Sequence, residues 1–329
     1  MNEHSLEVLS QYEISVEKTA RGRGTYLIWS DKSIYQLFEY NGTDTRLGFL
    51  RRLLTYIVEA GFENVDILYE TKEGELYSKD YAGNKYILKK YFNGRECDIK
   101  KNSDILSAVE ALANIHNLTS NIKDEELRGY DIMSPSLIEQ YGKHNREMKR
   151  VRTYIRNKNR RTRFEYDILH KFDEYYEYAS QAYNSLIESD YLDIKKQAID
   201  ALSICHGTYN HHNIVMCEDS VAVINFDHAN INMQLEDLYF FFRKLMEKHD
   251  WDVNLGNEII DKYSGIRPIN DKEWKIFKVM LMYPEKYWKI LNRYSNSRKS
   301  WIPDKNESKL QAVYDKQQKK MDFIKEIWS

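Results

Sequence analysis

One ordered run of polar residues in the second half of the chain sets the strongest limit on its fold. The run reads His206-Gly207-Thr208-Tyr209-Asn210-His211-His212-Asn213. A second polar group, Asn225-Phe226-Asp227, follows after two short apolar stretches that are separated by turn residues at 217–220. Apolar stretches joined by such a turn predict a β-hairpin. The sequence therefore predicts two polar loops at the ends of one hairpin, followed by a helix that opens near Glu236.

The spacing of these residues is typical of a phosphoryl-transfer centre. In kinase-like enzymes a loop Asp accepts the proton of the substrate hydroxyl, an Asn five residues later holds a metal, and an Asp after a short strand holds Mg²⁺ on the nucleotide phosphates. Asn213 occupies the position of that Asn, but Thr208 and Asn225 stand where the two carboxylates belong. Neither can act as a carboxylate base, and a neutral amide is a poor ligand for a hard dication. We therefore expect no intact catalytic residue in the degenerate loop of His206, Gly207, Thr208 and Asn213.

Asp227 leaves two interpretations open. It could hold a metal together with Asn213, which would leave a vestigial nucleotide or metal site at Asn213, Asn225 and Asp227. Alternatively, its carboxylate orients the polar loop through hydrogen bonds or caps the segment that follows, and this is the preferred interpretation. We expect Asp237 to bond the backbone of the polar loop from the start of a helix. His206 is expected to form structural hydrogen bonds and not to shuttle protons.

A zinc site is a further alternative, because histidines and cysteines lie close together at Cys205, His206, His211, His212 and Cys217. Their spacing matches no common structural-zinc pattern, and Cys205 is flanked by apolar residues as a core cysteine would be. We therefore predict no zinc there. The 3 Cys of the chain are an odd number without CxxC spacing, so we also predict no disulfide framework.

The composition excludes several functional classes. The formal net charge is −2 with 30% charged residues, so no overall field points to nucleic acid or to a membrane surface. No apolar run approaches the roughly 20 residues that a membrane helix needs. The segment Met1 to Ser5 has neither a basic nor an apolar region of a signal peptide, so we expect synthesis in the cytoplasm.

The N-terminal part of the chain predicts a small α+β lobe. Residues 26–40 alternate as a strand hairpin does, with a turn at 30–33. Residues 46–60 switch to helical spacing, and the helix is expected to end at Gly61. Further strands are expected at 66–70, 75–78 and 85–89, joined by Gly-containing turns. Strands around one helix describe a compact lobe.

The rest of the chain is mostly helical in pattern. One helix is expected to be capped by Asn102 or Ser103, and others to cover residues 164–187, 235–248, 255–263, 271–283 and 309–328. A hinge is expected at 91–94. We therefore predict an α/β (α+β) fold with a sheet-rich N-lobe over residues 1–92 and a large helical C-lobe over 93–329 that carries the degenerate loop. Together they form one two-lobed, kinase-like domain.

The segment 143–163 is strongly basic and is opposed only by Glu147. The preferred interpretation is a solvated charged helix and loop. Its one-sided charge also allows it to bind phosphate-rich polymers or an acidic partner; of these we keep the acidic partner and predict no nucleic-acid binding.

Several segments together carry a family resemblance. They are the degenerate loop itself, Glu39-Tyr40-Asn41-Gly42, Phe92-Asn93-Gly94-Arg95-Glu96-Cys97-Asp98 and Leu112-Ala113-Asn114-Ile115-His116. Over nearly its whole length the chain resembles the CotS family of bacterial spore coat proteins, which share the aminoglycoside-phosphotransferase-like kinase fold. The resemblance implies that a phosphate-binding lysine would stand just before Glu39, where this chain has Phe38. Lys32 lies in a turn and is badly placed to replace it, and Arg21-Gly22-Arg23-Gly24 lacks the full pattern of a Gly-rich phosphate loop.

The resemblance implies a role in the spore coat. The first hypothesis is a catalytically inactive kinase-like scaffold, a pseudokinase, that acts in coat assembly with other spore coat proteins and needs no cofactor. It would be made in the mother-cell cytoplasm and deposited in the coat, without insertion into a membrane. Two alternatives stay open: an active or weakly active phosphotransferase with a rearranged metal site at Asp227 and Asn213, and an adaptor that binds nucleotide. Both would use Mg-ATP.

Overall fold

The chain forms two compact units in the computed structural model, which describes residues 3–22, 24–31, 33–297 and 304–328. The first unit holds the chain up to Met133 together with Ala198–Asp237 and Lys262–Arg267. The second holds Ser134–Gln197, Leu238–Asp261 and the chain from Pro268 onward. Each unit is described by itself. The expected boundary between lobes at residue 92 stays a prediction.

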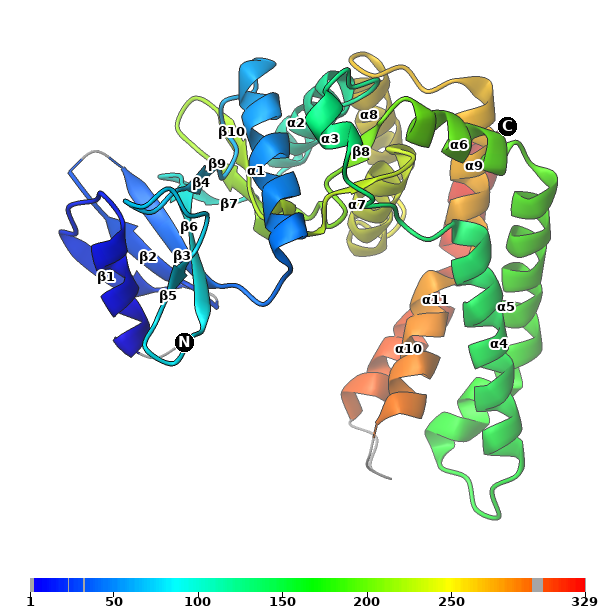
Figure 1. The fold of residues 1–329 in the computed structure, drawn as a ribbon. Helices are drawn as coiled ribbons and strands as arrows, with labels where there is room; N and C mark the ends of the chain where they lie inside the picture. Colours follow the sequence, from blue (N-terminus) through cyan, green and yellow to red (C-terminus); the bar gives the residue numbers. More distant parts are fainter. Residues whose placement is uncertain (1–2, 23, 32, 298–303, 329) are drawn as a thin grey trace. The chain divides into compact units, whose positions relative to one another are not determined.

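An antiparallel sheet forms the N-terminal part of the first unit (Figure 1). The predicted hairpin is confirmed, because Tyr26 pairs with Leu37 and Trp29 pairs with Ile34. The strand expected at 75–78 is shorter and lies later, at Ser78–Lys79. Strand order is β1-β2-β3-β6-β4, with β5 on β6, where the strands are β1 (Lys18–Arg21), β2 (Tyr26–Trp29), β3 (Ile34–Glu39), β4 (Leu68–Tyr69), β5 (Ser78–Lys79) and β6 (Lys85–Tyr91).

Apolar side chains on one face of this sheet form a core. Ile28, Leu37 and Leu88 are fully buried there, and the 3-10 helix η1 (Glu3–Gln11) adds Val8. Next comes α1 (Asp44–Glu59), which matches the predicted helix within two residues. It begins at Thr43, whose side chain accepts a hydrogen bond from the backbone N–H of Arg46 at 3.1 Å.

The polar loops lie at the ends of short strands, as predicted. Strands β9 (Ile214–Met216) and β10 (Val221–Val223) form the expected hairpin, and β7 (Arg95–Glu96) joins its edge. Strand β8 (Ile204–Cys205) pairs with β11 (Asn230–Ile231), which holds the two loops together. The turns η2 (His211–Asn213) and η3 (Phe226–His228) carry polar residues, and helices α2 (Asn102–Leu118) and α3 (Glu125–Arg128) complete this part.

The capping prediction for α2 was wrong. Lys101 stands at the N-cap and forms no side-chain cap bond, and Asn102 is the first helical residue. Asp104 lies in the first turn, where its carboxylate accepts a bond from the backbone N–H of Asp98 at 2.9 Å and pairs with Arg95. An acid in the first turn favours the helix start without a capping hydroxyl.

Helices make up the second unit. The pair α4 (Leu137–Arg156) and α5 (Arg163–Glu188) lies side by side (Figure 1), and each begins with a capping box. No helix of the described residues is long and apolar enough to cross a membrane. The remaining helices are α6 (Tyr191–Asp200), α7 (Leu235–Lys248), α8 (Val253–Ser264), α9 (Asp271–Met282), α10 (Glu285–Asn296) and α11 (Asp304–Ile327), of which α6, α7 and α8 have residues in both units.

Candidate functional site

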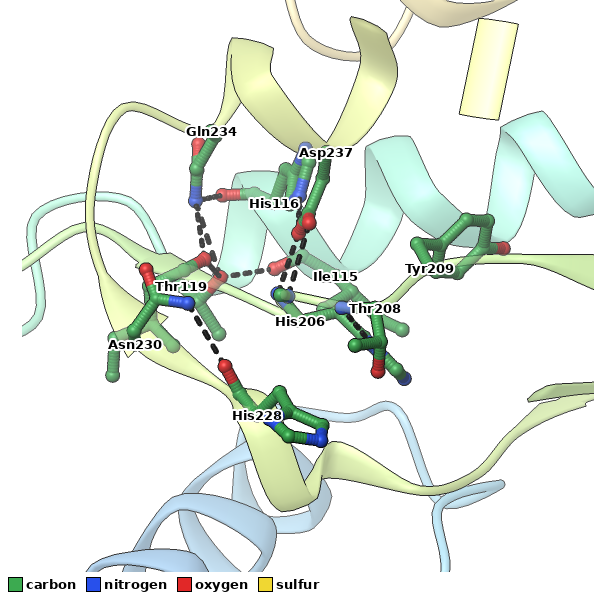
Figure 2. Close-up of polar contacts among 12 residues, drawn as sticks. Ile115, His116, Thr119, His206, Thr208, Tyr209, His228, Asn230, Gln234 and Asp237 are labelled. Carbon is green, nitrogen blue, oxygen red and sulfur yellow. Dashed lines mark hydrogen bonds and ion pairs between the residues drawn. The ribbon is translucent and has the colours of Figure 1, made fainter. Parts of the chain in front are cut away.

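Asp237 holds the backbone of the polar loop in place. Its two carboxylate oxygens accept hydrogen bonds from the backbone N–H groups of His206 at 2.5 Å and Gly207 at 2.9 Å (Figure 2). His116 on α2 reaches the same carboxylate with Nε2 at 3.3 Å. The side chain of Asp237 is 3% exposed, so these bonds form away from water. The prediction that Asp237 bonds the loop backbone is confirmed.

His206 is a buried hydrogen-bonding residue. Its Nε2 lies 3.0 Å from the carbonyl oxygen of Ile224, and its Nδ1 accepts the backbone N–H of Thr208 at 3.3 Å. Burial lowers the pKa of the imidazole, against the charge of Asp237. A neutral ring with Nε2–H donating satisfies both contacts. This geometry agrees with the structural role expected for His206.

Amide groups join the two polar loops. Nδ2 of Asn213 donates to the carbonyl oxygen of Thr208 at 3.0 Å, and Nδ2 of Asn225 donates to Oδ1 of Asn213 at 2.9 Å. The oxygen of Asn213 that would face a metal is thereby bound to another amide. Asn225 has a left-handed backbone with φ 65°, which Asn tolerates better than most residues. Its own Oδ1 is buried and has no hydrogen-bond partner among the described residues.

Lys89 on β6 is a central residue of the site, and the sequence analysis missed it. Its Nζ lies 2.7 Å from Oδ1 of Asp227 and 3.2 Å from Oδ2 of Asp66. The Lys89 side chain is 1% exposed, and that of Asp66 is fully buried. Asp66 also accepts the backbone N–H of Asn225 at 2.8 Å. We call Lys89, Asp66 and Asp227 the Lys89 ion-pair group.

The register of the sheet explains why this lysine reaches the site. Phe38 pairs with Ile87, and side chains two residues apart on a strand share a face. Lys89 therefore lies on the same face as Phe38, with Nζ 5.4 Å from the centre of its ring. The resemblance placed the missing lysine at position 38, but the neighbouring strand supplies a cation to that face. The available signal was alternation: Lys89 stands two residues after Ile87 and so shares its face of the strand, next to the buried run Tyr86–Leu88.

The charges of the group stabilise one another. Burial acts to lower the pKa of Lys89, but Asp66 and Asp227 outweigh it and raise this pKa, so the ammonium stays charged. For Asp227, burial acts to raise the pKa, but the charge and hydrogen bond of Lys89 lower it below its usual range. Burial raises the pKa of Asp66 to about 6, against the effect of Lys89.

The raised pKa of Asp66 predicts that the stability of the fold depends on pH. Because the pKa of Asp66 is about 6 in the folded chain and 3.8 by itself, the folded state binds the proton more tightly than the unfolded chain. The resulting stabilisation is present below pH 4 and is lost as the pH rises through 6. Relative to Asp66→Asn, we expect the wild type to lose up to about 3 kcal/mol of unfolding free energy between these pH values. Urea unfolding of both proteins at pH 4.5 and 7.5 measures this, and equal pH dependence in the two would contradict it.

Arg46 on α1 fixes the backbone of the second polar loop. Its Nε and Nη2 donate to the carbonyl oxygen of Asp227 at 3.0 and 2.5 Å. Asp227 is thus bound through its carboxylate to Lys89 and through its carbonyl to Arg46. The oxygens near this position are the Asp227 carboxylate, which is paired with an ammonium, Oδ1 of Asn213, which is bonded to an amide, and Oδ1 of Asn225, which has no hydrogen-bond partner among the described residues. This set offers one carboxylate, which Lys89 already neutralises, whereas Mg²⁺ is usually held by one or two carboxylates together with phosphate and water oxygens.

The structure also places the residues of the glycine-rich segment 21–24 and of the zinc alternative. The glycines Gly22 and Gly24 lie between β1 and β2 beside a cavity of about 270 Å³, whereas Arg23 and Lys32 lie outside the described residues. His212, one of the residues considered for a zinc site, bonds Glu96, with its Nδ1 2.9 Å from Oε2. Across the described part of the chain, no three His, Cys, Asp or Glu side chains come close enough to hold a metal together.

Comparisons with solved structures establish the fold. An aminoglycoside phosphotransferase from Alicyclobacillus acidocaldarius superposes with a TM-score of 0.86 at 16% identity, covering 97% of this chain and 94% of that one. A spectinomycin phosphotransferase in complex with ADP and spectinomycin gives 0.66 at 14% identity, over 100% and 95%. Amicoumacin kinase in complex with AMP-PNP and Ca²⁺ gives 0.62 at 14% identity, over 97% and 94%. The predicted kinase-like fold is confirmed.

Sequence comparisons establish the family. "Spore coat protein S" of Bacillus subtilis (strain 168) is 19% identical over 149 residues, which are 45% of this chain and 42% of that protein. The chain therefore matches less than half the length of this curated relative. Residues 5–327 match the family model described as "Spore coat putative kinase YutH". Because this match covers nearly the whole chain, and the fold is that of aminoglycoside phosphotransferases, the chain belongs to the YutH family of kinase-like spore coat proteins.

Proposed function

We propose that this chain is a catalytically inactive, kinase-like scaffold that acts in assembly of the spore coat. The observation that carries the proposal is the Lys89 ion-pair group. Asp227, the carboxylate two residues after the expected metal-ligand position Asn225, is bound to a buried ammonium 2.7 Å away. An internal cation thus stands where a kinase site needs an exchangeable one. Other coat proteins are the proposed partners, and the spore coat is the proposed location.

Two further features support inactivity. Proton removal from a substrate hydroxyl needs a base, and Thr208 supplies a hydroxyl with no carboxylate. Metal binding needs an anionic ligand after the strand, and Asn225 supplies an amide. Asp237 and Arg46 hold the backbones of both loops by hydrogen bonds. The arrangement thus serves the fold, and transfer chemistry is not required to explain it.

Calorimetric titration with ATP, with and without Mg²⁺, tests the proposal. We expect no Mg²⁺-dependent binding of ATP up to about millimolar concentration and no formation of ADP. The comparison protein carries both Thr208→Asp and Asn225→Asp, because it places carboxylates at both expected positions and leaves Lys89 unchanged. Phosphotransfer by the wild type would refute the proposal. Phosphotransfer by the double variant alone would mean that nucleotide still enters the site.

One observation favours a second candidate, a nucleotide-binding adaptor that does not transfer phosphate. Lys89 brings a positive charge beside Phe38, to the sheet face on which the family resemblance implies a phosphate-binding lysine. Structures with this fold contain ADP or AMP-PNP. Saturable ATP binding without ADP formation, weakened by Phe38→Asp, would select this candidate. Binding that is unchanged in that variant would place the nucleotide elsewhere.

A further inference from the structure

The outward face of α4 and the loop that follows it carry a dense group of exposed cations. Residues 143–163 hold ten of the 49 Lys and Arg residues of the chain but only one of its 51 Asp and Glu residues. The loop that joins the two helices lies at one end of the pair (Figure 1). We call the following exposed side chains the basic tip: Lys143, Arg146, Lys149, Arg150, Arg156, Arg160 and Arg163.

The periodicity of α4 turns these cations outward. Its buried positions Tyr141, Asn145, Met148, Val151 and Ile155 recur at steps of three and four, which is the spacing of one helix face. The cations occupy the positions between them and therefore project from the opposite side. From residue 143 to 156 this charged face extends about 20 Å along the helix.

Two carboxylates near the basic tip, those of Glu147 and Glu165, are already bound to other groups. Glu147 accepts a hydrogen bond from Nε1 of Trp288 at 2.8 Å. Glu165 is bound by Lys158 and by the hydroxyl of Tyr294, each at 2.5 Å. Within the part of the chain that the structure describes, the side chains of the basic tip form no ion pair. Their charge is left for an external partner.

The backbone beneath the cations is held in one conformation. Nε of Arg161 donates to the carbonyl oxygen of Ile155 at 2.8 Å, near the end of α4. Thr162 and Glu165 form the capping box that starts α5, with bonds of 3.3 and 2.8 Å between side chain and backbone. A surface that is ordered before binding loses less entropy when a partner docks.

We propose that the basic tip binds an acidic, extended segment of another protein. A segment of about six extended residues matches the charged length of α4. Some cations of this helix pair already bind carboxylates, as in Arg152 with Asp173 at 2.7 Å. Tyr154 and Tyr166, 58% and 56% exposed, lie within and beside the same stretch, and Tyr with Arg is typical of protein interfaces. That the partner is a coat protein rests on the proposed function.

Fluorescence anisotropy with a labelled polyglutamate peptide of about twenty residues tests the proposal on the full chain. Arg146→Glu, Arg150→Glu and Arg156→Glu together form the tip variant. Lys100→Glu, Lys123→Glu and Lys196→Glu form the control, with the same change of charge at exposed sites outside the basic tip. We expect the tip variant to bind at least about tenfold more weakly than the wild type, and the control to lose no more than about twofold.

Equal losses in the two variants would overturn the proposal, because overall charge would then explain binding. Tighter binding to duplex DNA or to anionic lipid vesicles than to the peptide would also overturn it. The affinity of the wild type for the peptide can also be measured from about 50 to 500 mM salt without any variant. An affinity that does not fall over this range would contradict an ion-pair interface. ATP turnover by the wild type would refute the inactive scaffold without changing these results, so the two failures are distinguishable.

Discussion

Replacing Lys89 by methionine is expected to lower the free energy of unfolding by about 3–5 kcal/mol. The substitution keeps most of the buried apolar volume and removes only the ammonium. Asp66, whose side chain is fully buried, would then face Asp227 with no cation between them. Removing one partner of a buried ion pair is costly because the remaining charge is left desolvated. Urea unfolding near pH 7.5, where Asp66 is ionised, measures the loss.

The double variant Lys89→Met with Asp66→Asn is the control for this result. It removes the buried carboxylate together with its cation, so we expect it to be more stable than Lys89→Met alone. The two substitutions touch one group, and their effects should therefore not add. A loss below about 1 kcal/mol in the single variant would mean that the ion-pair group does not stabilise the loops. Stabilisation of Lys89→Met, but not of the wild type, by millimolar Mg²⁺ would support the view that Lys89 replaces an exchangeable cation.

Gly207→Ala is the second substitution with a large expected effect. The backbone of Gly207 has φ +80°, and an added Cβ would lie 2.0 Å from the carbonyl oxygen of His228. The left-handed backbone costs an alanine about 1 kcal/mol, and relieving the contact requires the second polar loop to move, at a further cost of about 1–3 kcal/mol. We therefore expect a total loss of about 2–4 kcal/mol in urea unfolding.

Gly83→Ala separates the two contributions. Gly83 has nearly the same backbone, with φ +84°, but an added Cβ there meets no atom within 4 Å among the described residues. We expect this control to lose only the backbone part, about 1 kcal/mol. The difference between the two variants then reports how closely the loops at 207 and 228 are packed. Equal losses would show that the second loop moves aside at no cost.

Local sequence patterns predicted several elements of the first unit correctly, whereas η1, β1, β7, α3, β8 and β11 were not predicted. The hairpin of β2 and β3, the helix α1 and the hairpin of β9 and β10 were recognisable because their apolar residues repeat at the period of the element. In the second unit the sequence analysis missed α6 and α10. Helix α10 follows Pro284 and contains Tyr287, Trp288 and Tyr294, and aromatic residues favour a helix only weakly by themselves. Packing against α4 and α11 supports that helix, and no local pattern contains this information.

Thr208 and Asn225 were assigned to the two carboxylate positions from spacing alone, and this assignment stays a prediction. The contacts that decide what the site can do were not visible. Asp227 is bound by Lys89 from a strand 138 residues earlier and by Arg46 from a helix 181 residues earlier. Pairings of this kind depend on which strands become neighbours in the sheet and on which face each side chain takes.

The sequence by itself thus determined the family and the identity of the residues at the two expected carboxylate positions, Thr208 and Asn225, since each is encoded in residue type and spacing along the chain. Only the tertiary structure showed that the buried ammonium of Lys89 is paired with the carboxylate of Asp227. The physical reason is that charge burial is a property of three dimensions: Lys89, Asp66 and Asp227 stabilise one another only once the sheet and the polar loops have brought them within 2.7–3.2 Å.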